Sequence, residues 1–184
     1  MGQRENTLLE TIHHSSRVAS LCRMLGTKDG TVDVPLLQLS ALLHDIGKQS
    51  IPAEILNKPG KLTPEEFELV KTHAKLGAAQ IQSMVTALEL AADTALHHHE
   101  RYGDGKGYYG LIGEEIQPFA RIVSLCDVLD ALMSVRPYKQ AWKLRDALHY
   151  VHENAGVQFD PYWVGVLLSC REELSEFYQE ERND

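Results

Sequence analysis

The sequence has no run of about 18 apolar residues, and its first residues, MGQRENTLLE, lack the apolar stretch of a secretory signal. We therefore predict neither a transmembrane helix nor a membrane partner, and we expect a cytoplasmic protein. Cysteine is scarce too: Cys22, Cys126 and Cys170 lie far apart and form no CxxC pair. This spacing predicts neither a zinc knuckle nor a disulfide framework, and we expect three buried thiols.

Positively charged residues are fewer than negatively charged ones. The chain carries 18 Lys and Arg against 26 Asp and Glu, a net charge of −8. This balance argues against binding to a nucleic-acid polymer through its backbone. It does not exclude a small phosphate ligand, because bound divalent metals can reverse the local field.

Strand signals are absent, since no stretch sustains an alternation of apolar and polar residues. Apolar residues recur instead at helical spacing over residues 7–25. The start of another helix is indicated by Thr63 as the N-cap, with Pro64 at the first helical position and Glu66 completing a capping box. Further helices are predicted over 34–46, 85–100, 114–134, 143–155 and 161–180. The sequence thus predicts a single all-α domain, residues 1–184, of about seven helices.

A histidine and an aspartate stand together in ALLHDIGK, where His44 and Asp45 end an apolar segment and Lys48 follows one turn later. Imidazole nitrogen and carboxylate oxygen are good ligands for a divalent transition metal. Neighbours on a helix point about 100° apart, so both reach one ion only if the helix end faces it. Taken alone, the dipeptide is weak evidence and is better explained as a surface pair.

Other candidate ligands follow at wider spacing. They are His73, the pair His98 and His99 in HHHE, and Asp127 in RIVSLCDVLDALM. Asp127 has apolar neighbours on both sides, and a buried carboxylate must be paired, hydrogen-bonded or bound to a metal. Upstream, Glu10 and His14 are four residues apart and share a helix face.

This order, H…HD…H…HH…D with GDGKGYYG after the paired histidines, resembles the HD-GYP family of the HD phosphohydrolase superfamily. ALLHDIGKQSIPAEILNKPGKLTPEEFELVKTHAKLGA, HHERYGDGKGYYG and ARIVSLCDVLDALMSVRPYKQ match its motifs in order, over nearly the whole chain. The resemblance implies an all-helical, metal-dependent phosphodiesterase. Its substrate would be cyclic di-GMP, opened to linear pGpG and onward to GMP.

The resemblance also implies two or three divalent metal ions, of which iron or manganese are usual. The ligands that carry over are His44, Asp45, His73, His98, His99 and Asp127. Asp45 matches the position that bridges two metals. Glu10 and His14 match positions where some members hold a third metal. Alternatively, Glu10 is exposed and His14 alone closes the site.

Catalytic and substrate-binding residues are predicted from charge and position. Lys48 could bind a phosphate oxygen or protonate the leaving group, a role associated with its family counterpart. Arg136 and Lys139 of RPYK suit phosphate, and the arginine also suits a guanine edge. Asp130 could contact a base or orient a metal ligand. Tyr108 could stack or hydrogen-bond near the substrate.

The signature loop departs from the family pattern. Gly-Tyr-Pro is here Gly107-Tyr108-Tyr109, and Gly103 is inserted before Asp104. Losing proline frees φ and restores a backbone donor, so we expect a looser or re-aimed loop. The metal ligands are unaffected, and the effect should fall on substrate preference.

Several alternatives stay open. The chain could act on the mixed guanine–adenine cyclic dinucleotide, or be a general nucleotide phosphohydrolase. The altered tripeptide also suggests a catalytically weak module that binds nucleotide or docks a partner. Members of the family usually carry a sensory or receiver domain, which we do not find here, so a stand-alone enzyme and a segment of a longer regulator are both open. So are GGDEF-type protein partners and a homodimer.

Overall fold

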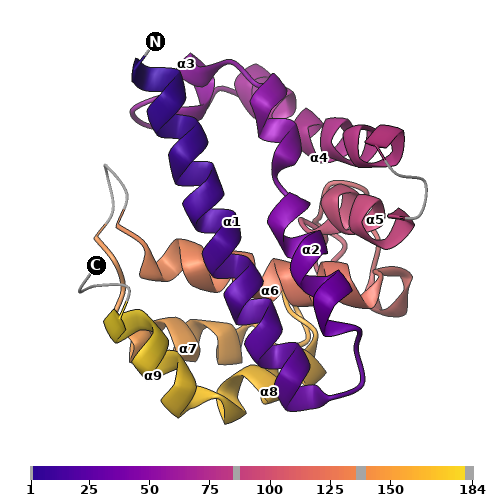
Figure 1. Cartoon of the computed structure of the whole chain (residues 1–184), viewed down its shortest axis with the longest axis vertical. Helices are drawn as coiled ribbons and strands as arrows, with labels where there is room; N and C mark the ends of the chain where they lie inside the picture. Colours follow the sequence, from indigo (N-terminus) through magenta and orange to yellow (C-terminus); the bar gives the residue numbers. More distant parts are fainter. Residues whose placement is uncertain (1, 85–87, 136–139, 181–184) are drawn as a thin grey trace.

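The computed structural model describes residues 2–84, 88–135 and 140–180 (Figure 1). Within these ranges the chain forms helices and no strand, which confirms the all-α prediction. In chain order the elements are α1 (Gly2–Asp29), α2 (Val34–Leu43), the 3-10 turn η1 (Ile46–Ser50), α3 (Ala53–Leu56), α4 (Pro64–Met84), α5 (Glu89–His97), the 3-10 turn η2 (Gly113–Glu115), α6 (Pro118–Met133), α7 (Leu144–Glu153), α8 (Pro161–Ser169) and α9 (Arg171–Glu180).

Helix starts follow their capping residues. The predicted capping box of α4 is present: the Thr63 hydroxyl accepts from the Glu66 amide at 3.2 Å, and the Glu66 carboxylate accepts from the Thr63 amide at 2.7 Å. The helix expected from residue 114 begins only at Pro118, because Pro118 takes the first helical position and the Gln117 side chain caps it. The last predicted helix is divided at Cys170 into α8 and α9.

Helix α6 is the centre of the fold and crosses behind α1, with α7, α8 and α9 along the lower side of the view (Figure 1). It is buried nearly all round, as expected of a helix without a polar face. Leu21 and Leu25 of α1 pack with Ile122 and Leu125 of α6 in the main core. The three cysteines are buried and unpaired, as predicted. No helix in the described part of the chain is long and apolar enough to cross a membrane.

A second, smaller core joins α4 and α5, which lie side by side (Figure 1). Turn η1 packs against α4 at a glycine contact. A Cβ on Gly47 would lie 2.0 Å from the His73 carbonyl oxygen and 2.6 Å from the Gly77 amide nitrogen. Only glycine therefore permits this approach, which brings the end of α2 up to His73.

Candidate metal centre

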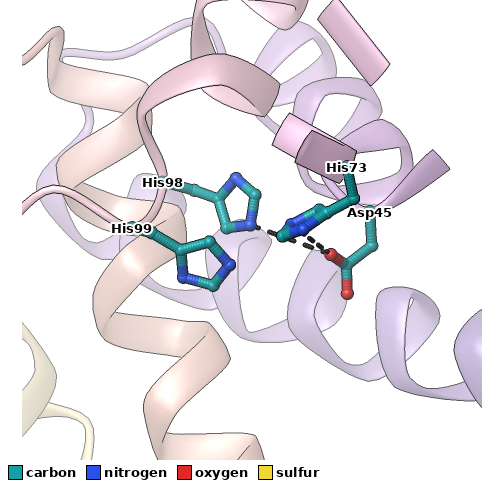
Figure 2. A group of neighbouring side chains, drawn as sticks. All are labelled: Asp45, His73, His98 and His99. Atoms are coloured by element: carbon teal, nitrogen blue, oxygen red, sulfur yellow. Dashed lines mark ion pairs between the residues drawn. The ribbon is translucent and has the colours of Figure 1, made fainter. Parts of the chain in front are cut away.

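The predicted ligands meet where five helices converge. His44 and Asp45 follow α2, His73 lies on α4, His98 and His99 follow α5, and His14 and Asp127 come from α1 and α6. Figure 2 shows His73 and His98 directed at the Asp45 carboxylate, with His99 beside them. His44, Asp45, His73 and His98 are each at most 2% exposed.

Three of these imidazoles are oriented in the same way, by the backbone of their own helical turn. Each Nδ1 lies against a carbonyl oxygen three residues earlier: 2.6 Å for His44 to Ala41, 2.6 Å for His73 to Val70 and 3.0 Å for His98 to Ala95. A carbonyl only accepts, so each Nδ1 is the donor and each Nε2 presents a lone pair. All three Nε2 atoms are buried without a hydrogen-bond partner, as is Asp45 Oδ1. Buried polar atoms are normally satisfied, so this set fits a bound cation.

Asp45 lies between two groups of ligand atoms. Its Oδ1 is 3.4 Å from His73 Nε2 and 3.8 Å from His98 Nε2. Its Oδ2 is 3.3 Å from His44 Nε2 and 3.9 Å from His14 Nε2. Two sets accordingly have ligand atoms within 4.8 Å of one another: Asp45, His73, His98 and His99, and His14, His44 and Asp45. The His/Asp cluster fits a divalent metal site.

The protonation states of His73, His98, His99 and Asp45 suit a bound cation. Burial lowers the pKa of His73, lowers that of His98 well below its usual range, and lowers that of His99 to about 4. Burial acts to raise the pKa of Asp45, but Lys48 and His44 hold it well below its usual range. Neutral imidazoles around an ionised carboxylate are the form in which these groups bind metal.

The His14 ring is held by two carboxylates of α6, those of Asp127 and Asp130. Its Nε2 lies 3.0 Å from Asp127 Oδ1, and its Nδ1 lies 2.7 Å from Asp130 Oδ2. Burial acts to lower the pKa of His14, but the hydrogen bonds to Asp127 and Asp130 raise it to about 9. Arg17 donates to both oxygens of Asp130, at 2.8 and 2.9 Å. Asp130 is 0% exposed and so has no surface to offer a base.

The remaining predicted residues lie as follows. Glu10 is exposed on α1 and belongs to neither ligand group. Lys48 donates to Asp45 Oδ2 and keeps 29% of its side chain exposed. The Tyr108 ring lies 4.6 Å from the His99 ring. Arg136 and Lys139 lie outside the described residues.

The signature loop is anchored by Glu100, which the sequence showed only as part of HHE. Its carboxylate is 2% exposed and accepts from the backbone amides of Tyr109 and Leu111, each at 2.8 Å. The first of these donors is the one that a proline at position 109 would lack. The restored donor thus helps to hold the loop, and the looser or re-aimed loop stays a prediction. Gly107 fits only as glycine, since a Cβ there would lie 2.6 Å from Glu100 Cα.

The inserted Gly103 ties the same loop to the connection between α7 and α8. Its amide donates to the Val157 carbonyl at 2.9 Å, and the Tyr102 amide donates to the Gln158 carbonyl at 3.1 Å. A Cβ on Gly103 would lie 2.0 Å from the Gly156 carbonyl oxygen. The inserted glycine therefore forms a close backbone contact between the loop and this connection. Arg17 was also missed from sequence, although its place three residues after His14 puts both on one face of α1.

Comparison with known proteins agrees with this geometry. The family model described as HD domain matches residues 5–162. The cyclic di-GMP phosphodiesterase response regulator RpfG of Xanthomonas campestris pv. campestris is 43% identical over 168 residues, which are 90% of this chain and 44% of that protein. The 3'3'-cGAMP-specific phosphodiesterase 2 of Vibrio cholerae is 34% identical over 169 residues, which are 90% of this chain and 32% of that protein.

A solved structure shares the fold. Bd1817, an HDG"Y"P protein from Bdellovibrio bacteriovorus, aligns with a TM-score of 0.70 and 25% identity over 90% of this chain and 52% of that one. The chain spans less than half the length of the two curated relatives named above. Sequence motifs, fold and ligand cluster agree, and the chain belongs to the HD domain family, in line with the HD-GYP resemblance.

Proposed function

We propose that this chain is a metal-dependent phosphodiesterase domain that hydrolyses cyclic di-GMP to linear pGpG and onward to GMP. The observation that carries the proposal is the set of three buried, unpartnered Nε2 atoms around one ionised carboxylate. Such a set binds divalent metal, and adjacent divalent metals stabilise the attacking and leaving oxygens of a phosphodiester displacement.

The two groups of ligand atoms support a site for two metal ions. His73, His98 and His99 would hold one, His14, His44 and Asp127 would hold the other, and Asp45 would serve both. Iron or manganese suits this mixture of imidazole and carboxylate, which contains no thiolate. A third ion at Glu10 and His14 stays a prediction, because Glu10 lies outside both groups.

Lys48 would bind the phosphate or act as the general acid that protonates the leaving group. Its ammonium group is paired with Asp45, and its side chain is partly exposed to solvent. A cation there can bind a phosphate oxygen or protonate the departing oxygen. Asp130 would position His14, and we propose this role for it in place of a base contact. Tyr108 would face the substrate, and Arg136 and Lys139 stay predicted phosphate contacts.

Cyclic di-GMP is preferred as the substrate because RpfG, a cyclic di-GMP phosphodiesterase by name, is 43% identical, against 34% for the cGAMP-specific enzyme. The mixed dinucleotide is the alternative that this second relative supports. A catalytically weak binding module is disfavoured by the assembled ligands and the ordered loop.

The wider setting is likewise proposed. Because the relatives are more than twice as long as the matched segment, a sensory or receiver domain is a fitting partner. Three unpaired cysteines are compatible with the reducing cytoplasm that we expect.

The test is anaerobic purification, loading with iron or manganese, and chromatography of the products from cyclic di-GMP and from the mixed dinucleotide. We expect pGpG from the loaded protein and none from His44→Ala or Asp45→Ala. Metal counting on the same sample should give two ions per chain. Fully loaded protein that turns over neither substrate would reject the phosphodiesterase.

A further inference from the structure

An aromatic wall runs outward from the metal centre to α4. The Tyr108 ring, already against His99, lies 6.3 Å from the His73 ring. Beyond it, the Phe67 ring lies 6.4 Å from Tyr108, with the two planes at 87°. Rings therefore follow one another from the ligands to the surface, and we call Phe67, Lys71 and Tyr108 the outer wall.

Lys71 adds a cation to this wall. It lies one helical turn after Phe67, so both are on one face of α4. Its Nζ is 5.9 Å from the centre of the Phe67 ring and 5.3 Å from that of Tyr108. The ammonium group also pairs with Glu68 Oε1 at 3.1 Å. Its side chain is 26% exposed, so it borders the solvent in front of the wall.

Phe67 is unusually accessible for an aromatic ring, at 46% exposed. Leu69 and Leu76 of the same helix are also exposed, at 40% each. They follow Phe67 by two and nine residues, about 200° and 180° around the helix, and so face the other way. Phe67 is connected to the metal centre by Tyr108, whose ring contacts both Phe67 and His73.

We propose that the outer wall is a subsite for a guanine base of the substrate, an inference that rests on the phosphodiesterase function proposed above. Bases stack on exposed aromatic rings, and a neighbouring cation strengthens the contact. A nucleoside joins phosphate and base through one ribose. If the phosphate is bound at the metal ligands, its base lies a ribose away from them, in the region of the Tyr108 and Phe67 rings.

The chemistry of Lys71 selects among bases. An ammonium group has three donors and no acceptor. Guanine presents two acceptors on one edge, N7 and O6, whereas adenine presents N7 beside an amino donor. Lys71 therefore favours guanine over adenine, and Phe67 and Lys71 are specificity-determining residues of the site.

The first test needs no turnover. Phe67→Trp keeps an aromatic ring in the wall and makes it fluorescent. Titration of manganese-loaded protein with GMP should quench this fluorescence, at a midpoint at least about fivefold below that of AMP. Ribose 5-phosphate, which has no base, should not quench. The unsubstituted protein gives the background from Trp142 and Trp163. Equal responses in both proteins, or equal midpoints for GMP and AMP, would overturn the subsite.

The second test separates binding from chemistry. For cyclic di-GMP, Phe67→Ala should raise KM by about 5- to 150-fold with little change in kcat, since one stacked base contributes about 1–3 kcal/mol. Lys71→Met, which keeps the stem without the charge, should remove the preference for GMP over AMP. The matched control is Met84→Ala, which truncates an exposed apolar side chain at the other end of α4, with unchanged KM.

The outcomes distinguish the two proposals. Hydrolysis with the same KM in Phe67→Ala and Met84→Ala would overturn the subsite and leave the phosphodiesterase standing. Quenching of Phe67→Trp by GMP in a protein that hydrolyses no cyclic dinucleotide would support the subsite and reject the enzyme.

Discussion

At the residue scale, the site depends on side chains that never touch the metal. Asp130 is the clearest case, because it is fully buried, accepts from Arg17 and holds His14 by its Nδ1. Substituting a group that orients a ligand in this way typically lowers metal affinity by about 10- to 100-fold. Its contribution is therefore measurable apart from catalysis.

We expect Asp130→Asn to weaken manganese binding by about 10- to 100-fold, because a neutral amide orients His14 less firmly and leaves Arg17 without its counter-ion. Competition with a fluorescent chelator measures this. Asp146→Asn, which removes an exposed carboxylate of α7, is the matched control. Unchanged affinity in Asp130→Asn would show that His14 needs no support from α6.

Much of this site could be predicted from sequence, and the limits have physical reasons. His44, Asp45, His73, His98 and His99 are marked by residue type and order, which chemistry constrains. The pairing of Arg17 with Asp130 joins residues 113 apart in the chain, so only the folded packing of α1 on α6 reveals it. The exposure of Glu10 is equally a property of the packing.

At the element scale, the contact of η1 with α4 sets the distance between Asp45 and His73. Gly47→Ala would place a methyl group 2.0 Å from the His73 carbonyl oxygen, which lies in the backbone of α4 and cannot turn away. We expect the free energy of unfolding to fall by about 1–3 kcal/mol, the range found for overpacked cores. Urea denaturation followed by circular dichroism measures it.

Gly165→Ala is the control for that change. A Cβ at this position on α8 meets nothing within 4 Å. Alanine should therefore stabilise the helix by about 0.5–1 kcal/mol. Similar stabilities for the two variants would show that η1 and α4 can separate at little cost.

The loop provides a second test at this scale. Restoring the family residue with Tyr109→Pro removes the amide that donates to Glu100 Oε1 at 2.8 Å. A hydrogen bond to a buried carboxylate contributes about 1.5–3 kcal/mol, and we expect that loss in urea denaturation. Tyr109→Phe keeps the amide and should stay within about 0.5 kcal/mol of the parent. If proline were as well tolerated as phenylalanine, Glu100 would not anchor this loop.

The loop also shows why element boundaries resist prediction. Gly103 and Tyr109 read as departures from a family pattern, because a pattern records residue types and not partners. Their partners, Val157 and Glu100, are known only once α5, α7 and α8 are assembled. The start of α6 was predicted at residue 114 and not at Pro118, although a proline is common at the first helical position.

At the scale of the whole molecule, the metal centre ties α1, α2, α4, α5 and α6 together, so metal binding should stabilise the entire fold. A ligand that binds only the folded state adds about 2.7 kcal/mol at 100 times its Kd. We expect Tm to rise with manganese concentration and to fall on chelation, as followed by thermal denaturation. Because Asp45 belongs to both ligand groups, Asp45→Asn should abolish the rise. His99→Ala removes a ligand from one group only and should keep part of the rise in Tm. Equal effects of the two variants would contradict two ions that share Asp45, and would instead indicate a single ion held by the whole cluster.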